Sequence, residues 1–205
     1  MIAGIIGVPS RLEIIEDLAA IIRPSVDHLE VFMDHERRGT WWNQARTIRA
    51  LTAKAAPGEP VLIMTDDAIT VPDWRERWER IHSQAQNSIY SLFTRQRFLF
   101  KDENVRRGYV TKCQPRGFYD QAFILIDQPG FMDKVQAWFD EGGKDLPSVA
   151  PRKTHLDVVM QEYLIAHNMP WTTSVPTIFD HRDVKSTLGH AVGVSPWYVG
   201  GINRL

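Results

Sequence analysis

The chain has 205 residues, of which 43% are hydrophobic, a length that supports one well-buried core and is short for two independent domains. Its 24 basic and 25 acidic side chains nearly cancel, so the formal charge of -1 excludes an overall field that would attract nucleic acid or an acidic membrane surface. Any anionic ligand must therefore be held by local groups.

The cysteine content and the hydropathy of the sequence indicate the cellular compartment of the protein. Cys113 is the only cysteine, which excludes an intramolecular disulfide and a zinc site built on several thiolates, and fits a reducing cytoplasm. The apolar start MIAGIIGVPS lacks a basic segment and leads directly into charged residues, which predicts a first strand and not a signal peptide. No stretch approaches the roughly 18 to 20 apolar residues that span a bilayer, so we expect a soluble protein.

The first half of the chain alternates strands and helices. Residues 2–8 form an apolar run that ends at Pro9, after which apolar residues recur at helical spacing up to residue 22. The further predicted elements are a strand at 28–33, a helix at 40–55 with Thr40 as N-cap, a strand at 61–64, a helix at 74–85 and a strand at 88–93. This alternation predicts an α/β fold with a largely parallel sheet that binds ligands at the carboxyl ends of its strands.

The second half has a mixed pattern. The predicted elements are short strands at 98–100, 109–112 and 121–126, and helices at about 131–141 and 154–167. The loop GGKDLPSVAPRK between the two helices is the best candidate for a mobile segment. From Pro170 onward the tail has no helical period, and we expect it to wrap back over the sheet.

Asp66 and Asp67 directly follow the buried strand VLIM. Adjacent carboxylates repel each other unless a cation or hydrogen-bond donors offset their charge. A bound divalent cation is the simplest way to offset it. The alternative is that the pair only forms a turn, where Asp is common. His181 and His190 in FDHRDVKSTLGH can join carboxylates around Mn²⁺ or Mg²⁺ if the tail folds back, although single histidines are more often surface or core residues.

The segment MTDDAITVPDW resembles the short acidic motif of GT-A glycosyltransferases, which holds the metal bound to the donor diphosphate. The resemblance covers most of the chain: GIIGVPSR resembles the first nucleotide-binding loop, GTWWNQAR a donor-side helix, SLFTR the strand after the acidic motif, and GFYDQAFIL with THLDVVMQEYL the acceptor half. The ending VPTIFDHRDVKSTLGH is similar to the closing segment of small bacteriophage-encoded glycosyltransferases, and more remotely to the lipooligosaccharide-type enzymes. The resemblance implies one GT-A-type, Rossmann-like α/β domain over residues 1–205, with a nucleotide-sugar-binding half at 1–94 and an acceptor half with a metal-binding tail at 95–205.

The resemblance also assigns chemical roles. The usual acidic motif is Asp-x-Asp, whereas position 65 is threonine; aligning the final acid makes Asp67 the main metal ligand and places Asp66 on the ribose or a metal-bound water. It implies that Asp157, near the start of the late helix, deprotonates the acceptor hydroxyl if the enzyme is of the inverting kind, with Gln161 on the same helix face. The alternative for Asp157 is an acid favoured by the helix dipole, with Thr154 as N-cap.

Donor-binding residues are predicted in the first half of the chain and at one later position. The set is Val8, Pro9, Arg11, Asp34, Asn43, Arg46, Asp66 and Gln121. Arg11 and Arg46 match phosphate geometry, although solvated helix charges explain them equally well. The resemblance implies that Asp34 contacts the base or ribose, with a turn-forming role as the alternative. Of Trp41 and Trp42, about 100° apart around the helix, we expect one in the core and the other facing the donor site or the loop before it.

The predicted function is metal-dependent transfer of a sugar from a nucleoside-diphosphate sugar to a hydroxyl acceptor, since a divalent cation stabilises charge on the leaving diphosphate. By analogy with the bacteriophage enzymes, we expect a hydroxymethylated pyrimidine in phage DNA as the acceptor, with a surface glycan or a small molecule as the alternatives. A local basic strip would contact DNA, although a solvated hairpin also explains it: Arg95, Arg97, Lys101, Arg106, Arg107 and Lys112. Metal-dependent nucleotidyl or phosphoryl transfer and a non-enzymatic nucleotide-binding or DNA-binding accessory role are the alternative functions.

Overall fold

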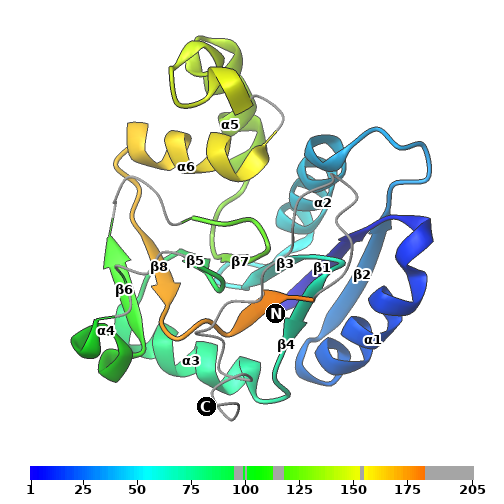
Figure 1. The fold of residues 1–205 in the computed structure, drawn as a ribbon, viewed down its shortest axis with the longest axis vertical. Helices are drawn as coiled ribbons and strands as arrows, with labels where there is room; N and C mark the ends of the chain where they lie inside the picture. The colour runs from blue at the N-terminus through cyan, green and yellow to red at the C-terminus, as the bar shows by residue number, and fades with distance from the viewer. Residues whose placement is uncertain (95–98, 100, 113–117, 153–154, 183–205) are drawn as a thin grey trace.

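The computed structural model describes residues 1–94, 99, 101–112, 118–152 and 155–182. A seven-stranded sheet with the order β2-β1-β3-β7-β5-β8-β6 forms the centre of the fold (Figure 1). Its strands are β1 (Ile2–Gly7), β2 (His28–Met33), β3 (Val61–Thr65), β5 (Ile89–Ser91), β6 (Tyr109–Lys112), β7 (Ala122–Leu125) and β8 (Trp171–Ser174). A separate antiparallel ribbon pairs β4 (Ala68–Thr70) with β9 (Phe179–His181).

Most strands of the central sheet run in one direction. β1 pairs in parallel with β2 and β3, and β5 pairs in parallel with β8. β7 lies between β3 and β5 and runs antiparallel to both, and β6 runs antiparallel to β8 at the edge. The expected α/β architecture with a mostly parallel sheet is confirmed.

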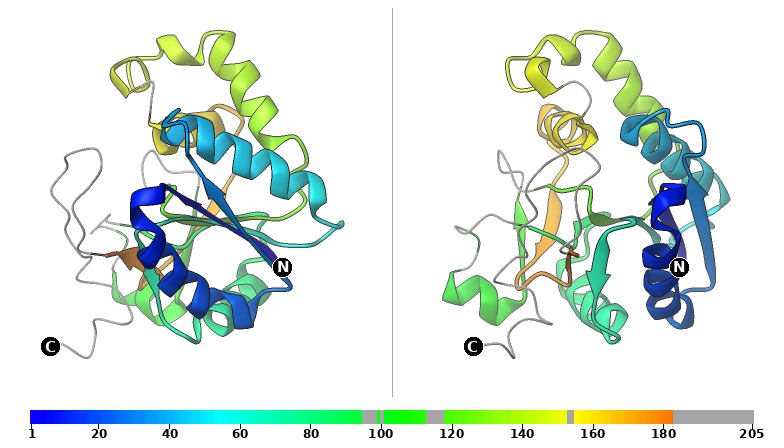
Figure 2. Two further views of the ribbon diagram at one scale, coloured as in Figure 1. Left: turned by 90° about the vertical axis from the view of Figure 1, so that its right-hand side faces the viewer. Right: turned by 45° about the vertical axis from the view of Figure 1, so that its right-hand side comes forward.

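Helices cover both faces of the sheet, as Figures 1 and 2 show. The helices are α1 (Leu12–Ile22), α2 (Thr40–Lys54), α3 (Trp74–Ala85), α4 (Asp102–Arg107), α5 (Phe131–Asp140) and α6 (Leu156–Ala166). Alternate residues of β3 face two different cores: Val61 and Ile63 contribute to the first, and Leu62 and Met64 to the second. Buried residues of α2, α5 and α6 belong to the first core, and those of α1 and α3 to the second. This burial on both faces explains why the central strands read as continuous apolar runs.

The C-terminal segment differs from the expected covering tail. Residues 171–174 enter the sheet as β8 between β5 and β6, and residues 179–181 then pair with β4 beside the acidic pair. The prediction that this tail only wraps over the sheet was therefore wrong for β8. The strand WTTS has a single large apolar side chain, Trp171, which is buried in the first core. Trp171, Thr172 and Thr173 are residue types that favour strands, but four residues with one large apolar side chain lack the apolar alternation that marks a strand in the sequence.

Other boundaries also differ from expectation. The helix α4 occupies a stretch expected to contain only strands and loops, whereas the predicted strand at 98–100 lies mainly outside the described residues. Thr40 is the first residue of α2, and the N-cap is Gly39 with a φ of 100°, a conformation that glycine adopts easily. The N-cap of α6 is His155, and Thr154 lies outside the described residues.

The loop after α5 is built around short 3-10 turns, at Gly143–Asp145 and Ala150–Arg152. Val149 between them is fully buried in the first core. The segment expected to be the best mobile candidate is thus anchored by a core contact. None of the helices in the described ranges has the length and hydrophobicity needed to cross a membrane.

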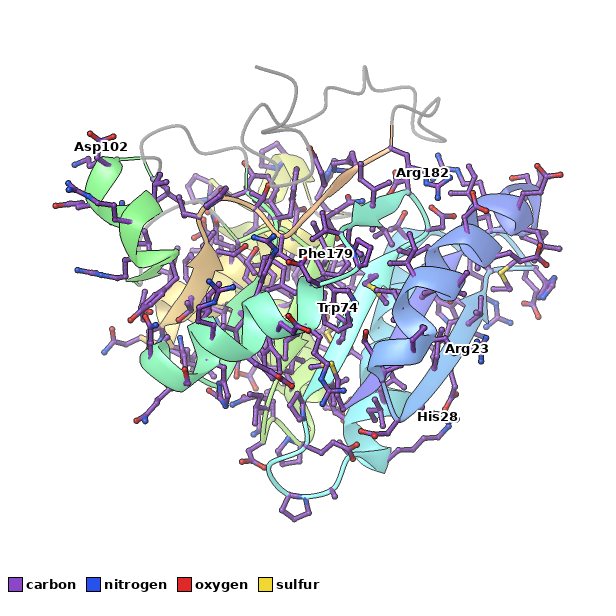
Figure 3. The ribbon with its side chains drawn as sticks, turned by 90° about the horizontal axis from the view of Figure 1, so that it is seen from below. Arg23, His28, Trp74, Asp102, Phe179 and Arg182 are labelled. Carbon is purple, nitrogen blue, oxygen red and sulfur yellow. The ribbon has the colours of Figure 1, made fainter. Side chains whose placement is uncertain are left out.

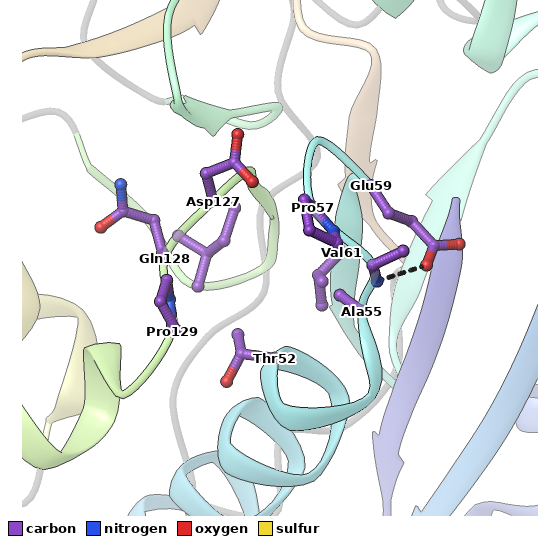
Figure 4. A pocket seen from close by; sticks show the side chains of 10 residues that line it. Thr52, Ala55, Pro57, Glu59, Val61, Asp127, Gln128 and Pro129 are labelled. Carbon is purple, nitrogen blue, oxygen red and sulfur yellow. Dashed lines mark hydrogen bonds between the residues drawn. The ribbon is translucent and has the colours of Figure 1, made fainter.

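A shallow cavity of about 180 Å³ lies at the amino end of β3 (Figure 4). Val61 and Leu125 form part of its lining, together with the turn at 55–59. The carboxylates of Glu59 and Asp127 at its rim accept hydrogen bonds from the backbone N–H groups of Ala56 and Gly58, at 3.0 and 2.6 Å. Sheets of this kind bind ligands at the opposite end of their strands, where β3 leads into Asp66 and Asp67.

Candidate functional site

The sheet has a topological switch point between β1 and β3. From β1 the chain continues to β2 on one side and returns later as β3 on the other side. The register pairs Ile6 with Thr65, so the carboxyl ends of the two strands lie next to each other. Open α/β sheets bind ligands in the crevice that forms at such a point. The residues that follow these two strands are therefore the candidates for a functional site.

Gly7 is the last residue of β1, and neighbouring side chains pack closely against its backbone. A Cβ atom at this position would lie 2.4 Å from Cδ1 of Ile15 and 3.3 Å from Cβ of Asp66. The chain then turns through the 3-10 segment Pro9–Arg11, which directs the Arg11 side chain back toward β3. Val8 and Pro9 thus form the turn that brings Arg11 to the acidic pair.

Asp66 is buried and bound to this first loop. Its Oδ1 accepts a hydrogen bond from Nη1 of Arg11 at 2.6 Å, and its Oδ2 accepts one from the backbone N–H of Val8 at 3.3 Å. Burial raises the pKa of Asp66, and the charge and hydrogen bond of Arg11 offset part of this rise. Asp66 therefore fastens the first loop to the end of β3.

Asp67 lies in a different environment from its neighbour. Its Oδ1 accepts hydrogen bonds from Oγ1 of Thr65 and Nε2 of Gln121, both at 2.8 Å. Its Oδ2 lies 3.5 Å from Nη1 of Arg11 and 3.6 Å from Nδ1 of His181. Burial raises the pKa of Asp67, but the interactions with His181, Gln121 and Thr65 outweigh burial and bring it below its usual range. The pKa of Asp67 is therefore shifted in the direction opposite to that of Asp66, and its ionised form is favoured.

His181 reaches the site through the ribbon of β4 and β9. Ala68 is the register partner of His181, and the backbone N–H of Arg182 donates to the carbonyl of Asp67 at 2.7 Å. Figure 3 shows Phe179 beside Trp74, with Arg182 farther along near α1; the ring centroids of the two aromatic residues are 5.8 Å apart. The predicted proximity of His181 to the acidic pair is confirmed, whereas His190 lies outside the described residues.

The Asp67–His181 pair fits a divalent cation in its donor types and separation. Oδ2 and Nδ1 are 3.6 Å apart, and two ligands each roughly 2.1 Å from one ion lie about 3 to 4 Å apart. Within the described ranges, no group of three or more His, Cys, Asp or Glu side chains is arranged to hold a metal ion. Mg²⁺ is usually bound through one or two carboxylates, with substrate phosphates and water as further ligands. A cation that arrives with a diphosphate needs no larger set of protein ligands.

A second acidic group lies next to Gln121. Asp120 precedes β7, and its Oδ2 accepts a hydrogen bond from Nε2 of the buried Gln44 at 2.7 Å. Burial and the charge of Asp157 raise the pKa of Asp120 well above its usual range, with a smaller contribution from Asp67. Asp157, in the first turn of α6, is therefore electrostatically coupled to the acids at the end of the sheet. No role was predicted for Asp120, because it lies two residues before the apolar run AFILI, at the start of a strand, whereas Asp67 follows the end of one.

The side chain of Gln161, which we expected on the same helix face as Asp157, is hydrogen-bonded to a backbone N–H group. Its Oε1 accepts a hydrogen bond from the backbone N–H of Phe118 at 3.3 Å. This contact ties α6 to the segment that leads to Asp120, and so helps to position the second acidic group.

Asp34, Asn43 and Arg46 hold the loop after β2 against α2. Asp34 accepts hydrogen bonds from the backbone N–H groups of Arg38 and Gly39, at 3.0 and 2.9 Å. Burial raises the pKa of Asp34, but these N–H groups outweigh it and lower the pKa overall. Nδ2 of Asn43 donates to the carbonyl of Phe32 at 2.8 Å, and Nη2 of Arg46 donates to Oδ1 of Asn43 at 2.8 Å. These contacts agree with the turn-forming interpretation of Asp34, and the predicted donor contacts of the three residues stay predictions.

The paired tryptophans at the start of α2 point to different surroundings. Trp41 packs against Phe139, with ring centroids 5.1 Å apart. The guanidinium groups of Arg38 and Arg46 both lie over the Trp42 ring, 4.5 and 4.6 Å from its centroid. Trp41 thus packs against the first core, as expected for one of the pair.

The basic strip expected to contact DNA is described only in part. Lys101, Arg106 and Arg107 are exposed in or next to α4, while Arg95 and Arg97 lie outside the described residues and Lys112 ends β6. The helix α4 begins with Asp102 and Glu103, so its surface carries both signs of charge.

Comparison with protein-family models and with curated protein sequences found no match to this chain.

Proposed function

We propose that this protein is a glycosyltransferase that moves a sugar from a nucleoside-diphosphate sugar to a hydroxyl acceptor with the help of a divalent cation. The observation that carries the proposal is the arrangement at the switch point, where ionised Asp67 faces His181 and Arg11. A carboxylate, an imidazole and a guanidinium in the crevice of an open α/β sheet are suited to a metal-bound diphosphate. The resemblance of MTDDAITVPDW to the acidic motif of GT-A enzymes supports the same function.

On the donor side of the site, the described residues would bind the cation and the diphosphate. Asp67 and His181 would hold Mn²⁺ or Mg²⁺, which stabilises the negative charge on the leaving diphosphate when bound. Arg11 would bind diphosphate oxygens, because its guanidinium matches their geometry. Asp66 keeps the loop that carries Arg11 at the end of β3.

The second acidic group would serve the acceptor. In the transfer, the bond between the anomeric carbon and the diphosphate oxygen breaks, a bond from the acceptor oxygen to that carbon forms, and the acceptor proton passes to Asp157. When two carboxyl groups interact, their pKa values move apart. At one pH, one group can then accept a proton as a base while the other, still protonated, donates a hydrogen bond. The raised pKa of Asp120 beside Asp157 supports this division. A hydroxymethylated pyrimidine in DNA is the acceptor that the bacteriophage resemblance favours.

The test is a turnover assay that detects released nucleoside diphosphate. A panel of nucleotide sugars is incubated with Mn²⁺ or Mg²⁺ and with hydroxymethylated or ordinary DNA. We expect release that needs the metal and the modified DNA. Release of nucleoside monophosphate or pyrophosphate would show a nucleotidyl or phosphoryl transferase, and absence of binding and turnover with every donor would refute the proposal.

The matched variants are Asp67→Asn and Asp140→Asn. Both remove one carboxylate charge, but Asp140 is exposed at the end of α5, away from the switch point. Asp67→Asn is expected to lower the metal-dependent rate by about 100-fold or more, because it removes a group that acts on developing charge. Asp140→Asn should keep the parent rate. Equal rates for the two variants would exclude Asp67 from the chemistry.

A further inference from the structure

Arg11 occupies the place between the two carboxylates at the switch point. Its Nη1 lies 2.6 Å from Oδ1 of Asp66 and 3.5 Å from Oδ2 of Asp67. The same Oδ2 lies 3.6 Å from Nδ1 of His181. The side chain of Arg11 is 10% exposed, and those of Asp66 and Asp67 are 9% and 19% exposed. A guanidinium charge is therefore already placed in a largely buried site, where screening by salt is weak.

Two electrostatic effects of Arg11 oppose the binding of a divalent cation at Asp67. Arg11 neutralises one of the two carboxylate charges, and its own positive charge repels a dication that approaches Asp67. A diphosphate removes both obstacles, because its oxygens offer the guanidinium a new charged partner and provide the cation with further ligands. Asp66 would keep the loop of Arg11 in place through its contact with the backbone N–H of Val8.

We infer that Arg11 blocks the Asp67 site against free divalent cations and opens it when a nucleoside diphosphate binds. The inference rests on the proposed function, since it takes the metal and the donor diphosphate as ligands of this site. Arg11 then couples the two ligands, so that the cation and the diphosphate are taken up together. By reciprocity, each ligand raises the affinity for the other by the same factor.

The first experiment measures the binding of Mn²⁺ alone, by electron paramagnetic resonance of the free ion. Arg11→Gln removes the blocking charge, so this variant is expected to bind Mn²⁺ at least about tenfold more tightly than the parent protein. Arg11→Lys keeps a positive charge and should bind Mn²⁺ as weakly as the parent. Arg23→Gln, an exposed residue at the other end of α1 (Figure 3), removes the same charge from the chain and should have no effect.

The second experiment measures nucleoside diphosphate without metal, by calorimetry. Arg11→Gln should weaken this binding by about tenfold or more, whereas Arg23→Gln should not change it. Opposite shifts in the affinities for Mn²⁺ and for nucleoside diphosphate distinguish a residue that exchanges partners from one that merely supports the fold, because loss of folding would weaken both.

A third measurement needs no variant. Crystals of the parent protein are soaked with Mn²⁺ alone or with Mn²⁺ and nucleoside diphosphate, and the ion is located by its anomalous scattering. We expect a strong signal beside Asp67 only with both ligands, with Arg11 on the diphosphate. A full Mn²⁺ signal at Asp67 with Arg11 still bridging Asp66 and Asp67 would overturn the inference.

The outcomes separate this inference from the proposed function. Unchanged affinity for Mn²⁺ alone in Arg11→Gln overturns the role of Arg11, even if the parent protein transfers sugars. Tighter Mn²⁺ binding in that variant, without sugar transfer by the parent from any donor, supports the role of Arg11 and removes the glycosyltransferase. Absence of Mn²⁺ binding in every protein and with every nucleotide overturns both.

Discussion

Asp66 and Asp67 are consecutive in the chain but lie in opposite electrostatic situations. Asp66 points toward β1, where burial raises its pKa and Arg11 is its main partner. Asp67 points toward β7 and β9, where Gln121 and His181 lower its pKa. Two adjacent residues at the end of a strand point to different sides, and this geometry allows Asp66 to hold the first loop while Asp67 faces His181.

A prediction at this scale concerns Asp120. Because its pKa is raised in the folded protein, ionisation of Asp120 lowers stability as pH rises from its unfolded value of about 3.9 toward neutral pH. Asp120→Asn removes this cost, and the new amide oxygen can still accept from Gln44. We expect the variant to be more stable than the parent at pH 8 by on the order of 1 kcal/mol, or about 2 to 4 °C in Tm, with a smaller difference near pH 4.

Thermal melts followed by circular dichroism at several pH values test this expectation. Asp140→Asn is the control and should show no such trend with pH. The same Asp120→Asn protein should be less active in the diphosphate-release assay, as expected where a functional group is kept at a cost in stability. A variant that is equally destabilised at pH 4 and pH 8 would contradict the assignment.

Residues of the site differ in how far the sequence reveals them. Asp67 could be predicted because it follows an apolar strand, and the end of a strand in a parallel sheet is a binding position. His181 could be predicted only as one of two histidines, since its approach to Asp67 depends on pairing between β4 and β9. Asp120 was not predicted, because its properties come from Gln44 and Asp157, which are far from it in the chain.

At the scale of elements, the contact between β1 and α2 is unusually close. A Cβ atom on Gly4 would lie 2.6 Å from Cδ1 of Leu51, 3.0 Å from Cγ2 of Thr47 and 3.4 Å from Cε2 of Phe32. Leu51 and Thr47 are fully buried, so they have little room to move. Glycine at this position allows α2 to pack directly on β1.

Gly4→Ala is therefore expected to destabilise the protein by about 1 to 3 kcal/mol through overpacking. Leu51→Ala alone should cost about 2 to 5 kcal/mol, but the double variant should be less destabilised than the sum, because the new methyl group fills space that Leu51 left. Urea unfolding of the four proteins gives the coupling free energy. Gly4→Ala combined with Leu18→Ala, which lies in the other core, should be additive; coupling of the same size in both pairs would contradict this packing argument.

The sequence predicted elements well where one periodicity was strong. The helices α1, α2 and α3 and the strands β1 to β3 were expected close to their observed positions, because apolar residues there recur at the spacing of each element. The helix α4 and the strand β8 were missed for a common reason. DENVRR and WTTS contain few apolar residues, so neither shows the apolar periodicity on which the predictions were based.

At the scale of the whole molecule, one sheet takes strands from both predicted halves of the chain. β3 from the first half pairs with β7 from the second, and β5 pairs with both β7 and β8. Leu62 and Ile63 of β3 are fully buried, in cores that also contain Ile124 and Phe123 of β7. The halves at 1–94 and 95–205 therefore share one folding unit in the described structure.

A fragment of residues 1–94 is accordingly expected to lack a cooperative fold. Its β3 would have an unpaired, apolar edge, and β5 would have lost both neighbours in the sheet. Thermal melts by circular dichroism and the dispersion of the ¹H–¹⁵N spectrum test this, with the full chain as the reference. A sharp melt and a dispersed spectrum for the fragment would show that the first half is a domain in its own right.

The position of β7 also has a consequence for the order of events during synthesis. β3 ends at Thr65, and its partner β7 begins at Ala122, more than fifty residues later. At roughly 5 to 20 residues per second, the β3 edge waits on the order of 3 to 10 seconds for its partner. During this interval the nascent chain presents an apolar strand edge to other chains. Slow codons between these strands would lengthen that exposure and lower the yield of folded protein without changing a single residue.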